Sequence, residues 1–362
     1  MDNSPGALPP AGLATLPVSL QWLALIAAPA ALAFLLELVH LPAALFIGPL
    51  LCGIVAGVNG MAVRVPRLAF AGAQAVVGCL IATSITLAIF STIVQEWPLV
   101  LGVVVATLFA SSLLGWLISR WGIMPGTTAV WGSAPGAATA MVLMAGAFGA
   151  DQRLVAFMQY LRVIMVTIGA AFIARLWVDT SGVPAPAIVW FPALDPLAFG
   201  ATLGAGAAGA LLGQLIRLPS PYFLGAFLLA AVLHLGFGLP LQLPEWLLAI
   251  SYAAVGWAIG LNFNRAIVAH AVRALPQIAL SILVLMAFCG MMGWLITQAL
   301  DVDPLTAYLA TSPGGMDSVA IIAAASNRVD MSFVMALQAA RFLVVLLFGP
   351  SLARLVAKTV KS

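Results

Sequence analysis

Long apolar runs dominate this sequence and limit what it can fold into. Six of them precede a polar, Pro-rich stretch and six follow it. Their ranges are 18–39, 42–59, 70–93, 97–119, 126–149, 152–177, 193–216, 220–239, 246–263, 275–298, 304–325 and 332–356. A helix needs about 20 apolar residues to cross a bilayer. The runs therefore predict an all-α polytopic membrane protein.

Composition excludes a soluble class and several kinds of partner. Charged residues make up 7% of the chain, whereas a soluble domain carries about 25%. The lipid bilayer is therefore the first expected partner. No basic cluster suits nucleic acid, and the scattered cysteines and histidines offer no metal-ligand spacing, so no cofactor is expected. These residues are Cys52, Cys79, Cys289, His40, His234 and His270.

Rare residues recur between the two sets of six runs. The tetrapeptide Gly115-Trp116-Leu117-Ile118 returns as Gly293-Trp294-Leu295-Ile296, and at the same offset Pro135-Gly136 meets Pro313-Gly314. The spacing of Asp151, Gln159 and Arg162 returns at Asp330, Gln338 and Arg341. We therefore expect a first membrane repeat at 1–180, a linker at 181–192 and a second repeat at 193–362.

Loop charges predict that the two repeats face opposite ways. Lys and Arg near helix ends favour the cytoplasmic side. The loop between the fourth and fifth runs has Arg120 in the first half but Asp301 and Asp303 in the second. Likewise, the loop between the third and fourth runs has Glu96 in the first half and Arg265 and Arg273 in the second. Opposite charge at equivalent loops indicates inverted topology.

Inversion requires an odd number of crossings in each half, so one run in each half makes no net crossing. The fifth run is the best candidate, because a Pro-Gly pair interrupts it. Making it re-entrant, or broken, in both halves gives about ten crossings and two broken helices. It also places ten of twelve loop Lys and Arg inside, with Arg175 and Arg328 outside. Both termini are then expected on the cytoplasmic side of a bacterial inner membrane.

The two interrupted runs are the first candidates for a binding site. Backbone that leaves the helix at membrane depth must be buried in protein or line a wet cavity. Such a break exposes N–H groups that suit an anion and carbonyls that suit a cation. The alternative is a proline kink that only tunes packing. The candidate backbone positions are Pro135, Gly136, Pro313, Gly314 and Gly315, and the neighbouring hydroxyls are Ser133, Thr139, Ser312 and Ser318.

The last run of each half contains one arginine about ten residues from its start, which places the arginine near mid-bilayer. A central Arg costs roughly 2.5–3.5 kcal/mol on insertion scales, so Arg162 and Arg341 must face the protein interior and find partners. Asp317 is the one acidic residue deep in a run, and is expected to pair with one of them. The remaining positive charge could meet an anionic substrate or carbonyls at a helix end. Alternatively, ion-pair and carbonyl bonds simply hold the halves together.

Gln159 and Gln338 each lie three residues before an arginine, on the same helix face. They could bind substrate or satisfy the backbone of the broken run, and the sequence leaves both roles open.

These motifs resemble the AbrB duplication-type membrane family over nearly the whole chain. The resemblance rests on Gly48-Pro49-Leu50-Leu51-Cys52-Gly53, on both Pro-Gly stretches and on the Asp–Gln–Arg spacings. It implies regulation of gene expression or, under the family's other label, ammonia monooxygenase activity. The chain offers no basic DNA-reading element and no flavin fingerprint or metal-ligand cluster. Regulation would therefore act indirectly.

Inverted repeats with discontinuous helices are typical of secondary transporters. The leading hypothesis is therefore a secondary transporter of a small, anionic solute or ion by alternating access, rather than an enzyme. A membrane regulator without flux and, less favoured, an integral membrane oxidase are the alternatives. A homo-oligomer is compatible with this layout.

Overall fold

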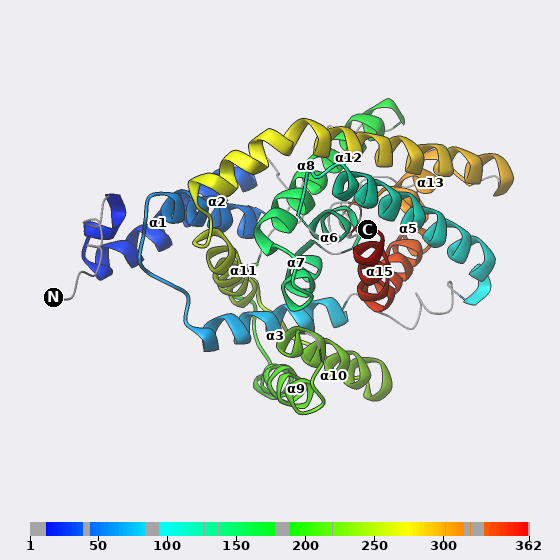
Figure 1. The fold of residues 1–362 in the computed structure, drawn as a ribbon. Coiled ribbons are helices and arrows are strands. Elements are labelled where there is room, and N and C mark those ends of the chain that lie inside the picture. The colour runs from blue at the N-terminus through cyan, green and yellow to red at the C-terminus, as the bar shows by residue number, and fades with distance from the viewer. Residues whose placement is uncertain are drawn as a thin grey trace.

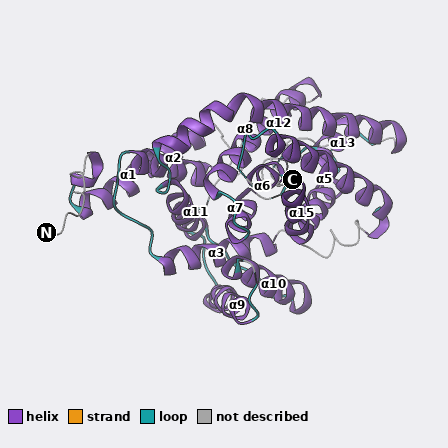
Figure 2. Cartoon of the chain, in the orientation of Figure 1, coloured by secondary structure: helices purple, strands orange, loops and turns teal. Residues whose placement is uncertain are grey.

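The fold was analysed in a computed structural model, which describes residues 12–38, 44–83, 94–125, 127–136, 138–177, 189–218, 220–300, 302–314, 319 and 329–360. Within these ranges every regular element is helical (Figure 2). The prediction of an all-α protein is confirmed for this part of the chain.

The first half contains a short 3-10 turn and seven α-helices among its described residues. They are η1 (Gly12–Thr15), α1 (Val18–Leu38), α2 (Ala44–Val58), α3 (Arg67–Thr83), α5 (Trp97–Arg120), α6 (Thr128–Ser133), α7 (Ala138–Ala147) and α8 (Gln152–Trp177). The second half has α9 (Pro196–Leu215), α10 (Pro221–Phe237), α11 (Glu245–Gly260), α12 (Arg265–Leu300), α13 (Pro304–Thr311) and α15 (Met331–Val360).

Six of these helices are long and apolar enough to cross a membrane, as judged by length and composition in the described residues. They are α1, α5, α8, α9, α12 and α15. Apolar helices of 10–17 residues accompany them, namely α2, α3, α7, α10 and α11. A multi-pass membrane protein is consistent with this set.

Two neighbouring helix pairs join the halves on one side of the molecule. Helix α2 packs on α11, helix α3 packs on α10, and α11 also packs on α3 (Figure 1). Glycine allows close approach here: a Cβ on Gly78 would lie 2.6 Å from the carbonyl oxygen of Phe223, and one on Gly256 would lie 3.1 Å from that of Phe46. Small residues at such crossings allow the backbones of membrane helices to approach closely. Helices α1 and α9 pack outside, on α2 and α10 respectively.

A second group of helices surrounds the interrupted runs. Helix α6 packs against α5 and α8, while α13 packs against α12 and α15. Helix α5 also contacts α15, and α12 also contacts α8. The short helices α6 and α13 are thus enclosed by longer ones, which positions the breaks that follow them inside the protein.

Helix α12 differs from the sequence expectation. It is one 36-residue helix that begins at Arg265, so Arg265 and Arg273 lie in its first turns rather than in a loop. Its length of about 54 Å exceeds the ~30 Å hydrocarbon core. Helical spacing of the buried residues Ala271, Ala274 and Ile278 continues through Pro276, and this packing keeps the segment helical despite the proline.

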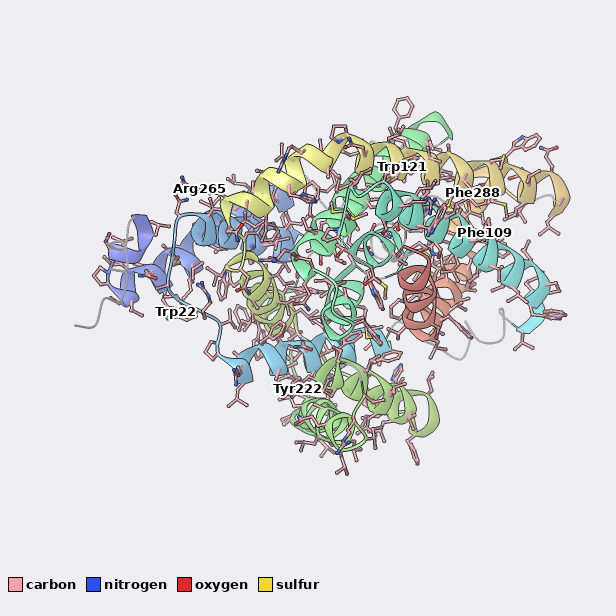
Figure 3. All side chains as sticks on the ribbon, in the orientation of Figure 1. Trp22, Phe109, Trp121, Tyr222, Arg265 and Phe288 are labelled. Atoms are coloured by element: carbon pink, nitrogen blue, oxygen red, sulfur yellow. The ribbon has the colours of Figure 1, made fainter. Side chains whose placement is uncertain are left out.

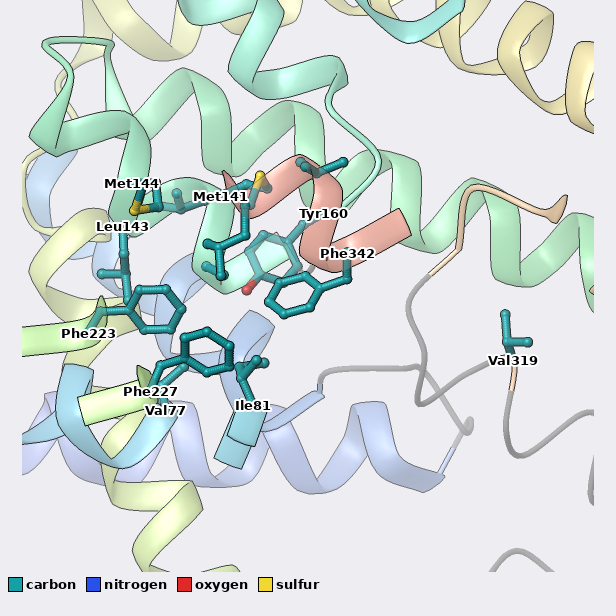
Figure 4. Packing of buried hydrophobic residues seen from close by; sticks show 14 of the residues in the cluster. Val77, Ile81, Met141, Leu143, Met144, Tyr160, Phe223, Phe227, Val319 and Phe342 are labelled. Carbon is teal, nitrogen blue, oxygen red and sulfur yellow. The ribbon is translucent and has the colours of Figure 1, made fainter. Parts of the chain in front are cut away.

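The interior and the exterior are both apolar, as expected for a chain whose solvent is lipid. In the core, Tyr160 lies near Phe342 and Met141, with Phe223 and Phe227 below them (Figure 4). Apolar side chains also cover the outer surface, where Phe109 is 69% and Trp121 is 68% exposed (Figure 3).

Candidate functional site

The first break follows α6, and Pro135 explains its polar contacts. In a helix, the N–H of residue 135 would bind the carbonyl of residue 131, but proline has no N–H. The side chain of Gln159 on α8 supplies the missing donor: its Nε2 lies 2.8 Å from the Trp131 carbonyl oxygen and 3.0 Å from that of Ala134. A buried amide therefore replaces a lost helix bond.

Arg162, one turn further along α8, binds the same break. Its Nη1 donates to the Ala134 carbonyl at 2.6 Å, and its Nη2 donates to the Gly136 carbonyl at 3.1 Å. The side chain is 1% exposed. Its positive charge thus faces the carbonyl end of α6, where the helix dipole favours a cation.

The second break, after α13, repeats this arrangement. Pro313 removes the N–H that would bind the Leu309 carbonyl, and Gln338 on α15 donates to that oxygen at 2.7 Å. The same Nε2 donates to the Ser312 carbonyl at 3.1 Å. Gln159 and Gln338 therefore perform the same structural task, one on each break.

Arg341 makes more contacts than Arg162. It donates to the Thr311, Ser312 and Gly314 carbonyls of the second break, at 3.3, 2.8 and 3.5 Å, and to Oε1 of Gln338. Its Nε also donates to the Pro135 carbonyl in the first break, at 3.1 Å. Arg341 therefore connects the two breaks directly, although they lie far apart in the sequence.

The candidate hydroxyls in the described residues also have partners. Ser133 donates to the Ala129 carbonyl at 2.6 Å, and Ser312 donates to that of Leu309 at 3.1 Å. Thr139 shares a hydrogen bond of 2.8 Å with the hydroxyl of Tyr160. Ser133 and Ser312 thus lie at the helix ends, while Thr139 lies on α7, across from Tyr160 on α8.

Gly315, Asp317 and Ser318 lie outside the described residues, so their expected roles stay predictions. Within the described part of the chain, the single ion pair joins Arg153 to Asp151, and neither Arg162 nor Arg341 contacts an acidic group. The bonds of both guanidinium groups go to backbone carbonyls and to Gln338. This was one of the two arrangements that the sequence left open.

The sequence did not single out Tyr160, Thr128 or Thr306 as site residues. Tyr160 stacks on Phe46 with ring centroids 4.4 Å apart. The Thr128 and Thr306 hydroxyls accept from the backbone N–H groups of Asp151 and Asp330, at 3.2 and 3.1 Å. A signal was present: both threonines occur at the repeat offset and precede the Pro-Gly pairs by similar distances.

Taken together, the site holds two buried cations and two interrupted helices with paired carbonyl ends. Its cations neutralise partial negative charge at the ends of α6 and α13, and the described residues supply no full negative charge to balance them. Such a site can attract an anion.

These features define a class: an all-helical, membrane-type protein with buried arginines at two breaks. Comparison with known proteins gives the family. The family model for the transition state regulatory protein AbrB matches residues 45–357, and the chain therefore belongs to the AbrB family. The resemblance expected from the motifs is confirmed.

Two relatives cover most of this chain. It is 48% identical over 320 residues to a protein of Escherichia coli (strain K12) named "Putative regulator AbrB", covering 88% of this chain and 91% of that protein. It is 24% identical over 304 residues to the "Uncharacterized protein YhjN" of Bacillus subtilis (strain 168), covering 78% and 77%.

Proposed function

We propose that this protein is a secondary transporter of a small anionic solute, working by alternating access across a bacterial inner membrane. The observation that carries the proposal is the pair of buried guanidinium groups, each placed at a helix break and neither neutralised by a described acidic residue. A buried charge without a counterion is expensive to maintain, which is reasonable where an anion must bind.

Matched packing supports two repeats, at 1–180 and 193–362 with a linker at 181–192, and the loop charges favour their inversion. Exchanging α2 with α10, α3 with α11, α5 with α12, α6 with α13 and α8 with α15 reproduces the main helix contacts. The hydrogen bonds of Gln159 and Gln338 correspond in the same way. In the proposed topology about ten segments cross the membrane, the two broken runs do not, and both termini are cytoplasmic.

The proposed mechanism follows from the backbone carbonyls that the arginines bind. Arg341 contacts the carbonyls of both breaks, so neither break can move without changing those bonds. An anion that takes over part of the guanidinium donor set would weaken the carbonyl contacts. The first and second repeats could then shift relative to each other, with Gln159 and Gln338 keeping the helix ends paired. Asp317 would neutralise an arginine or carry a coupling proton, and the backbone at Gly315 and the hydroxyl of Ser318 would complete the site.

The direct test is flux in vesicles that contain purified protein. Labelled carboxylates, phosphate and halides would be presented with and without a proton gradient. We expect uptake of one anion class to be lost in Arg162→Lys and Arg341→Lys, because lysine keeps the charge but not the forked donor geometry. Arg273→Lys, on the exposed start of α12, is the matched control. Flux unchanged in both site variants would remove the proposed role.

Topology has its own test. Single cysteines at positions 120 and 301, in a background without the three native cysteines, would be labelled by an impermeant reagent from either side. Inverted repeats require labelling from opposite sides. Labelling of both from one side would rule out inversion.

A membrane-embedded regulator that affects gene expression indirectly is the second candidate, favoured by the name of the Escherichia coli relative, "Putative regulator AbrB". Solute binding without movement across vesicles would support it over transport.

A further inference from the structure

The strongest unassigned feature is a small hollow beside Arg162, between α5, α6, α8 and α12. Its polar lining comes from Arg162, Ser133 and Ser281, and apolar side chains such as Leu114, Met158 and Leu285 form its walls. Among the described residues, the lining includes one charged side chain, the guanidinium of Arg162. The end of α6 thus borders a hollow with a positive charge, two hydroxyls and apolar walls.

Arg162 has an unused donor, and this separates it from Arg341. Its Nε atom is buried and has no hydrogen-bond partner within the described part of the chain, whereas Nε of Arg341 donates to the Pro135 carbonyl. An unpaired charged N–H group in an apolar interior loses its hydration without compensation. A ligand that accepts this hydrogen bond would remove that penalty.

The size of the hollow limits the ligand. Its volume is about 10 Å³, which corresponds to roughly one water-sized particle. A halide ion is only slightly larger than a water molecule, whereas a carboxylate or phosphate with several heavy atoms would need a much larger displacement of the walls. The hydroxyls of Ser133 and Ser281 now donate to helix carbonyls at 2.6 and 2.7 Å, but a hydroxyl rotates and can donate to a new acceptor instead.

We propose that this hollow is a binding site for a single halide-sized monovalent anion, held by Arg162 with the Ser133 and Ser281 hydroxyls. The proposal deepens the function proposed above, because it names the size and charge of the ligand at Arg162, and it rests on that function only for the movement of the ligand. A neutral water molecule is the competing occupant, since it could accept from Nε of Arg162 without any charge preference.

Chloride-dependent thermal stability of the purified protein tests the proposal, with gluconate as the replacement anion at constant ionic strength. A ligand that binds the folded state raises the melting temperature with concentration. We expect chloride and bromide to stabilise the wild-type protein, with sulfate and gluconate inactive. Ser281→Val should raise the half-maximal chloride concentration at least tenfold without changing the fold.

Ser251→Val is the matched control. Like the partly buried Ser281, Ser251 is a helix serine that donates to a backbone carbonyl, that of Leu247 at 2.8 Å. It is buried on α11, away from the hollow. We expect its chloride response to equal that of the wild type. Equal responses in the Ser281 and Ser251 variants, or equal stabilisation by gluconate, would overturn the proposal.

Crystals grown in bromide locate the ion by anomalous scattering. A bromide peak between Arg162 and Ser281 supports the site, and a water molecule there with no bromide overturns it. The two proposals can fail separately: halide binding without solute flux removes the transporter and keeps the site, while flux without halide binding does the reverse.

Discussion

The break after α6 and the break after α13 use the same residue types but differ in how fully their polar groups are paired. At the second break, Gln338 donates to two carbonyls and accepts from Arg341. At the first, Gln159 donates to two carbonyls, but its Oε1 and the Nε of Arg162 are unpaired within the described residues.

This difference indicates a division of labour between the two halves. Arg341 binds the second break and reaches across to Pro135, so it holds the halves in one arrangement. Arg162 binds only its own break, and its Nε donor is unpaired in the described residues, beside the hollow. Arg341 thus acts mainly in holding the structure together, and Arg162 is better suited to bind a ligand.

The largest expected effect separates the two arginines by stability. Arg341→Met leaves carbonyls of both breaks and the Gln338 oxygen unpaired, and each orphaned buried group costs about 1–3 kcal/mol. We expect the free energy of unfolding to fall by at least about 3 kcal/mol in Arg341→Met. In Arg162→Met, which affects two carbonyls, we expect it to fall by about 2 kcal/mol. The melting temperatures of the two variants in detergent would show which variant loses more stability. A lower melting temperature for the Arg162 variant would reverse the comparison.

The next effect concerns the glycines that let α5 and α12 approach the short helices. A Cβ on Gly115 would lie 2.5 Å from the Ser133 hydroxyl oxygen and 2.9 Å from Cα of Val130. For a Cβ on Gly293, the nearest atom among the described residues would be the Thr311 hydroxyl oxygen, at 3.0 Å. We expect Gly115→Ala to destabilise by about 2 kcal/mol and Gly293→Ala by about 1 kcal/mol.

Gly102→Ala provides the control within α5. A Cβ there meets open space, and alanine favours the helix by up to about 1 kcal/mol. Thermal unfolding of the three variants should rank Gly102→Ala as the most stable. If Gly293→Ala were the least stable instead, the tighter crossing would not be the one at the first break.

Much of this arrangement could be predicted from the sequence, because a few rare residues stand out in an apolar background. The runs located the helices, the Pro-Gly pairs located both breaks, and the depth of the arginines required buried partners. The sequence even contained the pairing logic, since a proline at position 135 or 313 leaves one defined carbonyl without a donor.

The remaining features depend on how distant helices meet. Spacing along α15 places Gln338 and Arg341 on one face, but it does not show that Arg341 reaches the Pro135 carbonyl. In α12, the charges of Arg265 and Arg273 suggested a loop, whereas packing of Ala271 and Ala274 extends the helix through them. Local charge was a weaker guide there than the helical spacing of buried residues.

A smaller effect distinguishes the two glutamines. Gln159→Leu and Gln338→Leu each remove two donor bonds to the backbone, but only the second also removes the acceptor that pairs with Arg341. We expect Gln338→Leu to be more destabilising by about 1 kcal/mol, the net value of one buried hydrogen bond. Equal melting temperatures would mean that the Gln338–Arg341 contact adds nothing to stability.

The smallest expected effect concerns two threonines that make the same contact in both halves. Thr128 and Thr306 are both buried. Each hydroxyl accepts from the backbone N–H group of the aspartate that directly precedes the following long helix, at 3.2 Å from Asp151 and 3.1 Å from Asp330. Valine keeps the shape and removes the acceptor, so Thr128→Val and Thr306→Val should each cost about 0.5–1 kcal/mol. Because the two threonines bind different segments, the double variant should show the sum of the single losses. Unequal single losses, measured by thermal unfolding, would show that the asymmetry extends beyond the arginines to the loops that hold α8 and α15. A double loss that differs from the sum would show that the two loops are coupled.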